Sequence, residues 1–129
     1  MKNLSYVLIV AIVAAFALTS HSDAGDLTPL GKWQTVSGES RYEVINCGGG
    51  QLCARLTWLR ADARTEENLQ YLNKYVMAGA RQTAANKWRG KVLYDGDSYG
   101  GSMILVDTDK LKLRGCAGIF CQSMEFVRI

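Results

Sequence analysis

The chain has 129 residues, and its 15 lysines and arginines against 12 aspartates and glutamates leave a formal net charge of +3. Acidic and basic residues are interspersed, so the charge balance does not indicate a polyanionic partner such as a nucleic acid. The one histidine, His21, lies in the N-terminal stretch. If that stretch is removed, catalysis by a Ser-His-Asp or Cys-His arrangement is excluded.

The first 24 residues have the pattern of a secretory signal peptide. Lys2 supplies one positive charge, residues 6–18 are apolar, and Ser22 and Ala24 are the small residues that a signal peptidase requires. The apolar run is shorter than the roughly 20 residues that span a bilayer, which disfavours a retained membrane anchor. We predict cleavage after Ala24, leaving 25–129 as one domain that is periplasmic or secreted and has no stable membrane span.

Alternating apolar and polar residues predict the first three strands. Residues 31–36 form the first, and residues 37–40 turn the chain. Residues 41–47 and 52–59 flank a turn made of three consecutive glycines. In the third strand Leu52, Ala54, Leu56 and Trp58 share one face, the period of two that is typical of a half-buried antiparallel strand.

The segment 60–86 is the least regular. Thr65, followed by Glu66 and Glu67, has the residues of a helix start, and apolar residues then recur at helical spacing. We expect one short helix over roughly 65–75. Residues 75–79 fit a short strand equally well, and 79–86, which are small and polar, predict an exposed loop.

The pattern of strands resumes after residue 86. Strands are expected at 87–95, 99–106, 110–115 and 121–128, with turns rich in aspartate and glycine between them. Seven or eight strands joined by tight turns usually form a closed barrel, which removes exposed strand edges. The predicted fold is therefore all-β: a small antiparallel up-and-down barrel with one short helix.

Four cysteines flank two of the turns, as Cys47 with Cys53 and Cys116 with Cys121. In an oxidising compartment such close pairs predict one disulfide within each hairpin, although a crossed pairing also satisfies the sequence. The alternative is a zinc site with four cysteines. Zinc ligand pairs usually lie two to four residues apart, whereas the spacers here are five and four residues. Compartment and spacing both favour disulfides, and we predict no metal site and no cofactor.

Two motifs resemble those of lipocalins and other calycins. Gly31-Lys32-Trp33 begins the first strand, and Arg128 lies in the last. In calycins an arginine of the closing region packs across the tryptophan of a Gly-x-Trp strand. The resemblance implies that Trp33 and Arg128 close one end of the barrel, as a guanidinium plane stacked on an indole.

A wider set of motifs resembles the bacterial secreted family called domain of unknown function 2147. Ala54, Gly96 and Gln122 depart from its usual glycine, proline and arginine, and 60–86 hardly matches. The resemblance implies a compact calycin-like barrel in the bacterial envelope and no particular activity. The matching motifs are 31–33, 41–47, 52–53, 56–59, 88–92, 94–95, 111–116, 118 and 121–123.

Six aromatic residues are predicted to face the barrel interior, where they would line a cavity for an apolar ligand or simply fill the core. They are Trp33, Tyr42, Trp58, Trp88, Tyr94 and Phe126.

Charged residues supply weaker candidates. Outward-facing arginines would bind an anionic headgroup or a carboxylate, although a solvated outer face is the interpretation that the sequence favours. Paired aspartates would hold calcium or cleave a glycoside, but β turns favour the same residues. The arginines are Arg41, Arg55 and Arg114, and the aspartates are Asp95, Asp97, Asp107 and Asp109.

The sequence favours two functions, both non-enzymatic. The first is an exported barrel that binds a small apolar or lipid-like ligand, with 60–86 as a lid over one mouth. The second is a secreted interaction or inhibitor module that contacts an envelope or host protein through its disulfide-stapled hairpin tips, since rigid loops lower the ordering cost of binding. A filled barrel with an exposed apolar patch at Ile119 and Phe120 would favour the second. A third hypothesis is a hydrolase that uses two carboxylates, which would have to lie within about 5–10 Å of each other in one cleft.

Overall fold

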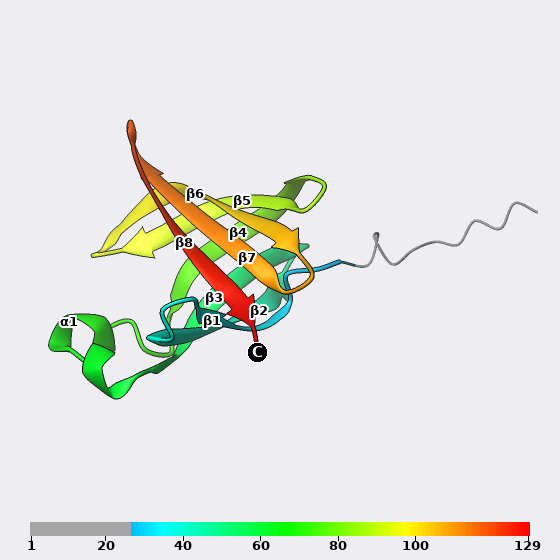
Figure 1. Ribbon diagram of the computed structural model, residues 1–129. Helices are drawn as coiled ribbons and strands as arrows, with labels where there is room; N and C mark the ends of the chain where they lie inside the picture. The colour runs from blue at the N-terminus through cyan, green and yellow to red at the C-terminus, as the bar shows by residue number, and fades with distance from the viewer. Residues whose placement is uncertain (1–26) are drawn as a thin grey trace, which may run out of the picture.

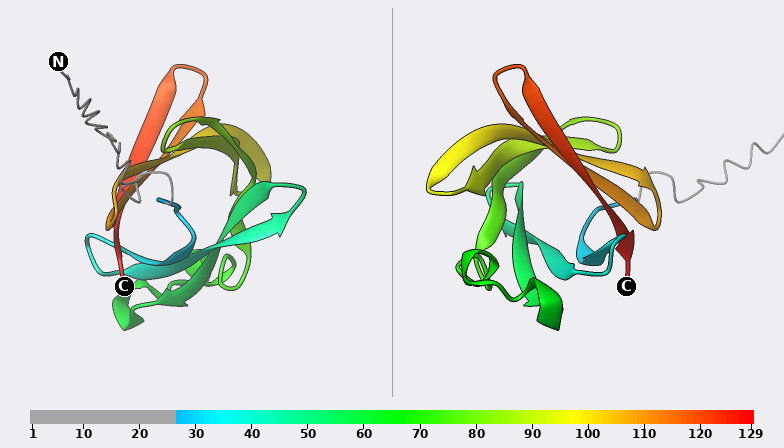
Figure 2. Two further views of the ribbon diagram at one scale, coloured as in Figure 1. Left: turned by 90° about the vertical axis from the view of Figure 1, so that its right-hand side faces the viewer. Right: turned by 60° about the vertical axis from the view of Figure 1, so that its left-hand side comes forward.

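The computed structural model describes residues 27–129, so the predicted signal peptide, 1–24, lies outside the described residues. Eight antiparallel strands form a closed barrel in which each strand pairs with its neighbours in sequence and β8 pairs with β1 (Figures 1 and 2). This confirms the predicted up-and-down barrel. The strands are β1 (Gly31–Thr35), β2 (Ser40–Gly48), β3 (Gln51–Leu59), β4 (Tyr75–Ala84), β5 (Lys87–Tyr94), β6 (Asp97–Asp107), β7 (Lys110–Ala117) and β8 (Phe120–Arg128).

The connection between β3 and β4 contains the helical residues. A 3-10 turn, η2 (Ala61–Ala63), precedes a single helical turn, α1 (Glu66–Leu69). Thr65 caps α1, since its side chain accepts a hydrogen bond from the Asn68 amide at 3.1 Å. The helix starts where the sequence predicted but is shorter than 65–75. Within 27–129, no helix has the length and apolar character needed to cross a membrane.

Strand β4 corrects the prediction of an exposed loop at 79–86. It pairs with β3 on one side and β5 on the other, and its Met77 and Ala80 are completely buried. The small residues of this segment have low strand propensity, but closure of the barrel requires a strand between β3 and β5. Gly79 has φ +64° and lies where the register between β4 and β5 shifts, as expected of a bulge.

A bulge in β3 corrects the prediction that Trp58 faces inward. Arg41 pairs with Trp58 and the next residue, Tyr42, pairs with Leu56, so Thr57 is an extra residue in β3. The extra residue reverses the alternation after it. Trp58 consequently moves to the outer face, while Leu59, only 4% exposed, takes the inner position.

The core fills the barrel. Trp33, Met77 and Met103 have no exposed surface. Around them pack residues from β2 to β8, so that the core draws on every strand. The remaining members of the buried cluster are Val44, Leu52, Ala54, Ala80, Trp88, Leu105, Leu111 and Phe126.

Glycines allow β5, β6 and β7 to curve tightly around one side chain, Val92. A Cβ atom added at Gly101 would overlap Val92 Cγ2, and one added at Gly115 would lie 3.4 Å from the same atom. Gly101 is buried. The two glycines thus leave the inner-face space that Val92 occupies.

We expect Gly101→Ala to lower the free energy of unfolding by about 1–3 kcal/mol through overpacking. Adding Val92→Ala should recover part of the loss, because it removes the overlapping methyl group. Gly90→Ala is the matched control: its Cβ would lie 2.6 Å from the Ala78 carbonyl oxygen, a backbone atom that Val92→Ala leaves in place. Urea unfolding followed by circular dichroism measures Gly101→Ala and Gly90→Ala, each with and without Val92→Ala. Equal rescue of both glycine variants would contradict this explanation.

Candidate functional site

Four of the six predicted aromatic residues contribute to the barrel interior. Trp33, Trp88 and Phe126 are buried, and Tyr42 is half-buried. The Tyr42 and Phe126 rings meet edge to face with centroids 5.2 Å apart, a favoured aromatic geometry. Burial raises the pKa of the Tyr42 phenol above its ordinary value, opposed by a smaller effect of the hydrogen bond that it accepts from Ser40 at 3.3 Å.

The space among these residues is too small for a lipid. The interior cavity has a volume of about 10 Å³ and an apolar lining that includes Trp33, Tyr42 and Phe126. One water molecule needs roughly 10–15 Å³ measured in this way, and small-molecule sites usually offer about 300–1,000 Å³. The aromatic residues therefore act as core in this conformation. Binding of an apolar ligand stays a prediction, since these residues leave no preformed cavity of the size that such a ligand needs.

The other two aromatic residues lie outside the barrel. The Arg41 guanidinium carbon lies 4.3 Å from the centroid of the Trp58 ring, on the outer surface. Tyr94 is 52% exposed and stacks on Tyr71 of the β3–β4 connection, with centroids 5.8 Å apart. The nearby Glu67 carboxylate raises the pKa of the Tyr94 phenol. Trp58 and Tyr94 thus cannot line an interior pocket.

Arg128 clamps the N-terminal lead-in over one end of the barrel. Its guanidinium carbon lies 4.2 Å from the centroid of the Trp33 ring. Its nitrogens donate hydrogen bonds to the carbonyl oxygens of Thr28 at 3.0 Å, Leu30 at 2.8 Å and Thr108 at 2.9 Å. The Trp33 indole also donates to the Pro29 carbonyl at 2.8 Å. Lead-in, β1 and β8 are joined here by stacking and by hydrogen bonds.

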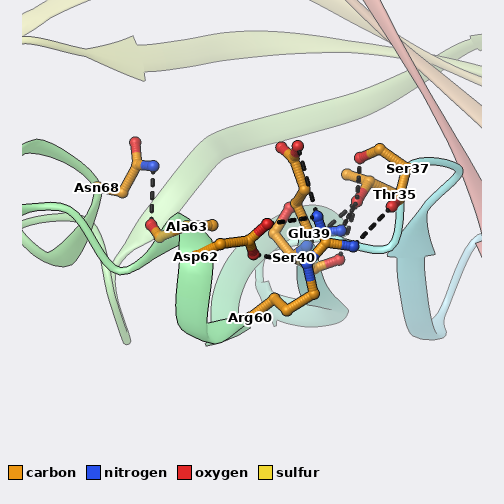
Figure 3. Close-up of polar contacts among 8 residues, drawn as sticks. All are labelled: Thr35, Ser37, Glu39, Ser40, Arg60, Asp62, Ala63 and Asn68. Carbon is orange, nitrogen blue, oxygen red and sulfur yellow. Dashed lines mark hydrogen bonds and ion pairs between the residues drawn. The ribbon is translucent and has the colours of Figure 1, made fainter.

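Arg60 has a comparable structural role at the opposite end, and the sequence analysis missed it. It donates two hydrogen bonds to Asp62, at 2.6 and 2.9 Å, and a third to the Ser37 carbonyl at 3.1 Å (Figure 3). The hydrogen bonds from Arg60 lower the pKa of the Asp62 carboxyl. In the adjacent β1–β2 turn, Thr35 Oγ1 accepts from the amides of Glu39 and Ser40. The arrangement fixes the start of the β3–β4 connection to this turn.

The predicted arginines do not gather into one site. Arg41 lies beside a shallow outer groove of about 280 Å³, and Arg55 pairs with Glu43 at 3.1 Å. Arg114 lies on β7 and is exposed. Three separate cations of this kind do not enclose an anion.

The predicted aspartates serve the turns. The Asp107 carboxylate accepts a hydrogen bond from the Asp109 amide at 2.8 Å, and Asp95 has φ +52° at the start of the β5–β6 turn. Within the described part of the chain, no three histidine, cysteine, aspartate or glutamate side chains gather in a way that would hold a metal ion.

Both predicted disulfides are present, Cys47–Cys53 in the β2–β3 hairpin and Cys116–Cys121 in the β7–β8 hairpin. The second hairpin, orange to red in Figures 1 and 2, projects well beyond the barrel wall. In β8 every residue from Phe120 to Glu125 is exposed, and burial begins only at Phe126. A strand whose two faces are both exposed is no longer part of the barrel wall.

The tip of this hairpin is apolar. Ile119 is 89% exposed and Phe120 is 76% exposed, the two most exposed large apolar side chains of the described residues. Met124 on the same strand is 46% exposed. No charged residue occurs from 115 to 124. Large exposed apolar groups on a rigid element are typical of interaction surfaces.

Fold and surface define a small filled β-barrel that presents one disulfide-stapled hairpin to its surroundings. The chain belongs to the family described as "Uncharacterized protein conserved in bacteria (DUF2147)", whose model matches residues 31–128. This confirms the resemblance drawn from the sequence motifs. No curated protein and no solved structure matches the chain.

Proposed function

We propose that this chain is an exported, non-enzymatic protein-interaction module whose β7–β8 hairpin contacts a protein partner. The observation that carries the proposal is the exposure of Ile119 and Phe120 at the tip of a hairpin that projects from a filled barrel. Export to the periplasm or beyond is supported by the two disulfides, which persist in oxidising compartments, and by the bacterial family.

The hairpin is well suited to binding because its conformation is set in advance. The β7–β8 ladder continues without a register shift from the pair Lys110–Val127 to the pair Ala117–Phe120. The disulfide joins Cys116 to Cys121, the pair next to the last one at the tip. A partner therefore does not have to order this segment on binding, which lowers the entropic cost. Aromatic side chains such as Phe120 are common anchors at the centres of interfaces.

Site-specific photocrosslinking tests the proposal in the bacterial envelope. A photoreactive phenylalanine derivative replaces Phe120 in the full chain, and the control places it at Val106, which is 59% exposed at the end of the barrel opposite the hairpin tip. We expect a discrete protein adduct from position 120 and none from position 106. An absence of adducts at both positions, or the same adducts at both, would contradict the proposal.

A further inference from the structure

The outer edge of β8 is open over the projecting part of the hairpin. Strand β1 pairs with β8 only through Phe126, Val127 and Arg128, whereas β7 pairs with β8 along its whole length. Among residues 27–129 no strand pairs with the other side of 120–124. Such an unpaired edge accepts another strand.

The direction of the unpaired backbone groups follows from the hydrogen bonds at the base of the hairpin. The Glu125 carbonyl accepts from the Val36 amide on the β1 side, and the Arg128 amide donates to the Asp109 carbonyl on the β7 side. Because main-chain groups alternate along a strand, Cys121 and Ser123 also direct theirs to the β1 side, which is open at their level.

The disulfide supports this assignment independently. Cys116 and Cys121 face each other with their Cα atoms 4.0 Å apart. In an antiparallel ladder the shorter spacing belongs to pairs that exchange no hydrogen bonds with each other. The main-chain groups of Cys121 must then point away from β7 and toward the open edge.

From this geometry we infer that the partner of the hairpin is a second copy of this chain, joined by antiparallel pairing of the two β8 edges. This rests on the proposed function, because it assigns a partner to the same hairpin. With a two-fold axis at Gln122, Cys121 of each copy lies opposite Ser123 of the other. Both residues direct their amides and carbonyls outward, so the two symmetric pairs form four hydrogen bonds.

The side chains are self-complementary in this register. Phe120 lies opposite Met124 of the second copy, in the closer, non-hydrogen-bonded type of pair. The two-fold axis makes two such pairs, so the exposed Phe120 and Met124 side chains of both copies are covered. Sulfur–aromatic contact favours this pairing. No charged residue occurs between 120 and 124, so no like charges face each other.

Sedimentation equilibrium on the purified, oxidised protein tests the inference. We expect a concentration-dependent dimer that Ser123→Pro weakens about thirtyfold, because proline removes one donor from each of the two symmetric pairs. Proline is tolerated here, since this N–H does not pair with β7. Ser123→Ala is the matched control: it removes the hydroxyl, keeps the N–H, and should dimerise as the unmodified chain does. If Ser123→Pro fails to fold, Phe120→Lys provides the second variant, with loss of dimer expected.

The outcomes separate this inference from the proposed function. A monomer at all concentrations up to about 1 mM, or a dimer that Ser123→Pro and Phe120→Lys leave unchanged, overturns the inference. If the adduct from position 120 then contains a protein other than this chain, the hairpin remains an interaction element with another partner. If the chain is monomeric and position 120 gives no adduct, both proposals fail. A dimer together with an adduct of twice the chain mass supports both.

Discussion

Replacing Trp33 by alanine should lower the free energy of unfolding by about 3–5 kcal/mol, the usual cost of deleting a fully buried tryptophan. Trp33 has no exposed surface, and its indole donates a hydrogen bond to the Pro29 carbonyl. Its removal also leaves the Arg128 guanidinium without the ring on which it stacks. The loss therefore combines a core cavity with release of the lead-in that covers one end of the barrel.

Trp58→Ala is the matched control, because the chain has a second tryptophan stacked with an arginine. Arg41 lies over Trp58 at 4.3 Å, almost the same separation as Arg128 over Trp33, but this pair is on the outer surface. We expect Trp58→Ala to cost only about 1 kcal/mol, since exposed cation–π pairs contribute little. Urea unfolding followed by far-ultraviolet circular dichroism avoids dependence on tryptophan fluorescence. Equal losses for the two variants would show that the position of Trp33 in the core is misjudged.

Reduction of both disulfides should cost about 4 kcal/mol in total, because each closes a short loop worth about 2 kcal/mol in restricting the unfolded chain. The sequence separations are six for Cys47–Cys53 and five for Cys116–Cys121. Small domains are stable by only about 5–15 kcal/mol, so this loss is a large fraction of the total and should lower the melting temperature clearly. Thermal unfolding with and without reductant measures the difference.

The two disulfides should differ in their local effects. Cys116→Ala with Cys121→Ala should loosen the hairpin tip, where residues 120–124 are exposed and pair with β7 alone among the described strands. Cys47→Ala with Cys53→Ala affects a hairpin in which Cys53 is buried. Amide hydrogen exchange should therefore accelerate at 120, 122 and 124, whose amides face β7, in the first variant and leave the β1–β4 ladders protected. An unchanged melting temperature on reduction would contradict the expected loss of stability. Thiols that alkylate without reduction would contradict both the disulfides and the proposed export.

The proposed interaction surface rests on the contrast between the barrel interior and its outer surface. The interior is occupied by Trp33, Met77 and Met103, which leaves about 10 Å³ of empty space. The surface offers an uncharged hairpin tip and an open strand edge on the same element. A titration of tryptophan fluorescence with fatty acids remains the direct measurement for apolar ligand binding.

Much of the fold could be predicted from the sequence because its causes are local. Alternation with a period of two placed Leu52, Ala54 and Leu56 on the inner face, and turn residues marked most of the hairpins. Cysteines that flank one turn are close in space in a hairpin, so their spacing favoured the pairing of Cys116 with Cys121. The structure then decides against the crossed pairing that the sequence left open. Trp33 and Phe126 were placed in the interior by the same alternation.

Tertiary structure alone decided the features on which the proposed function rests. The bulge at Thr57 reverses Trp58 because β2 and β3 must curve with the barrel, and no local pattern records that curvature. Whether eight strands enclose a cavity depends on the summed volume of side chains from all of them, which is a property of the packed interior. The open edge of β8 exists because β1 ends at Thr35 while β8 continues to Phe120. Sequence alone determined most of the strands and turns and the favoured disulfide pairing, through short-range alternation and spacing. Only the closed barrel decided what faces water, because exposure depends on the relative lengths and curvature of strands that are distant in the chain.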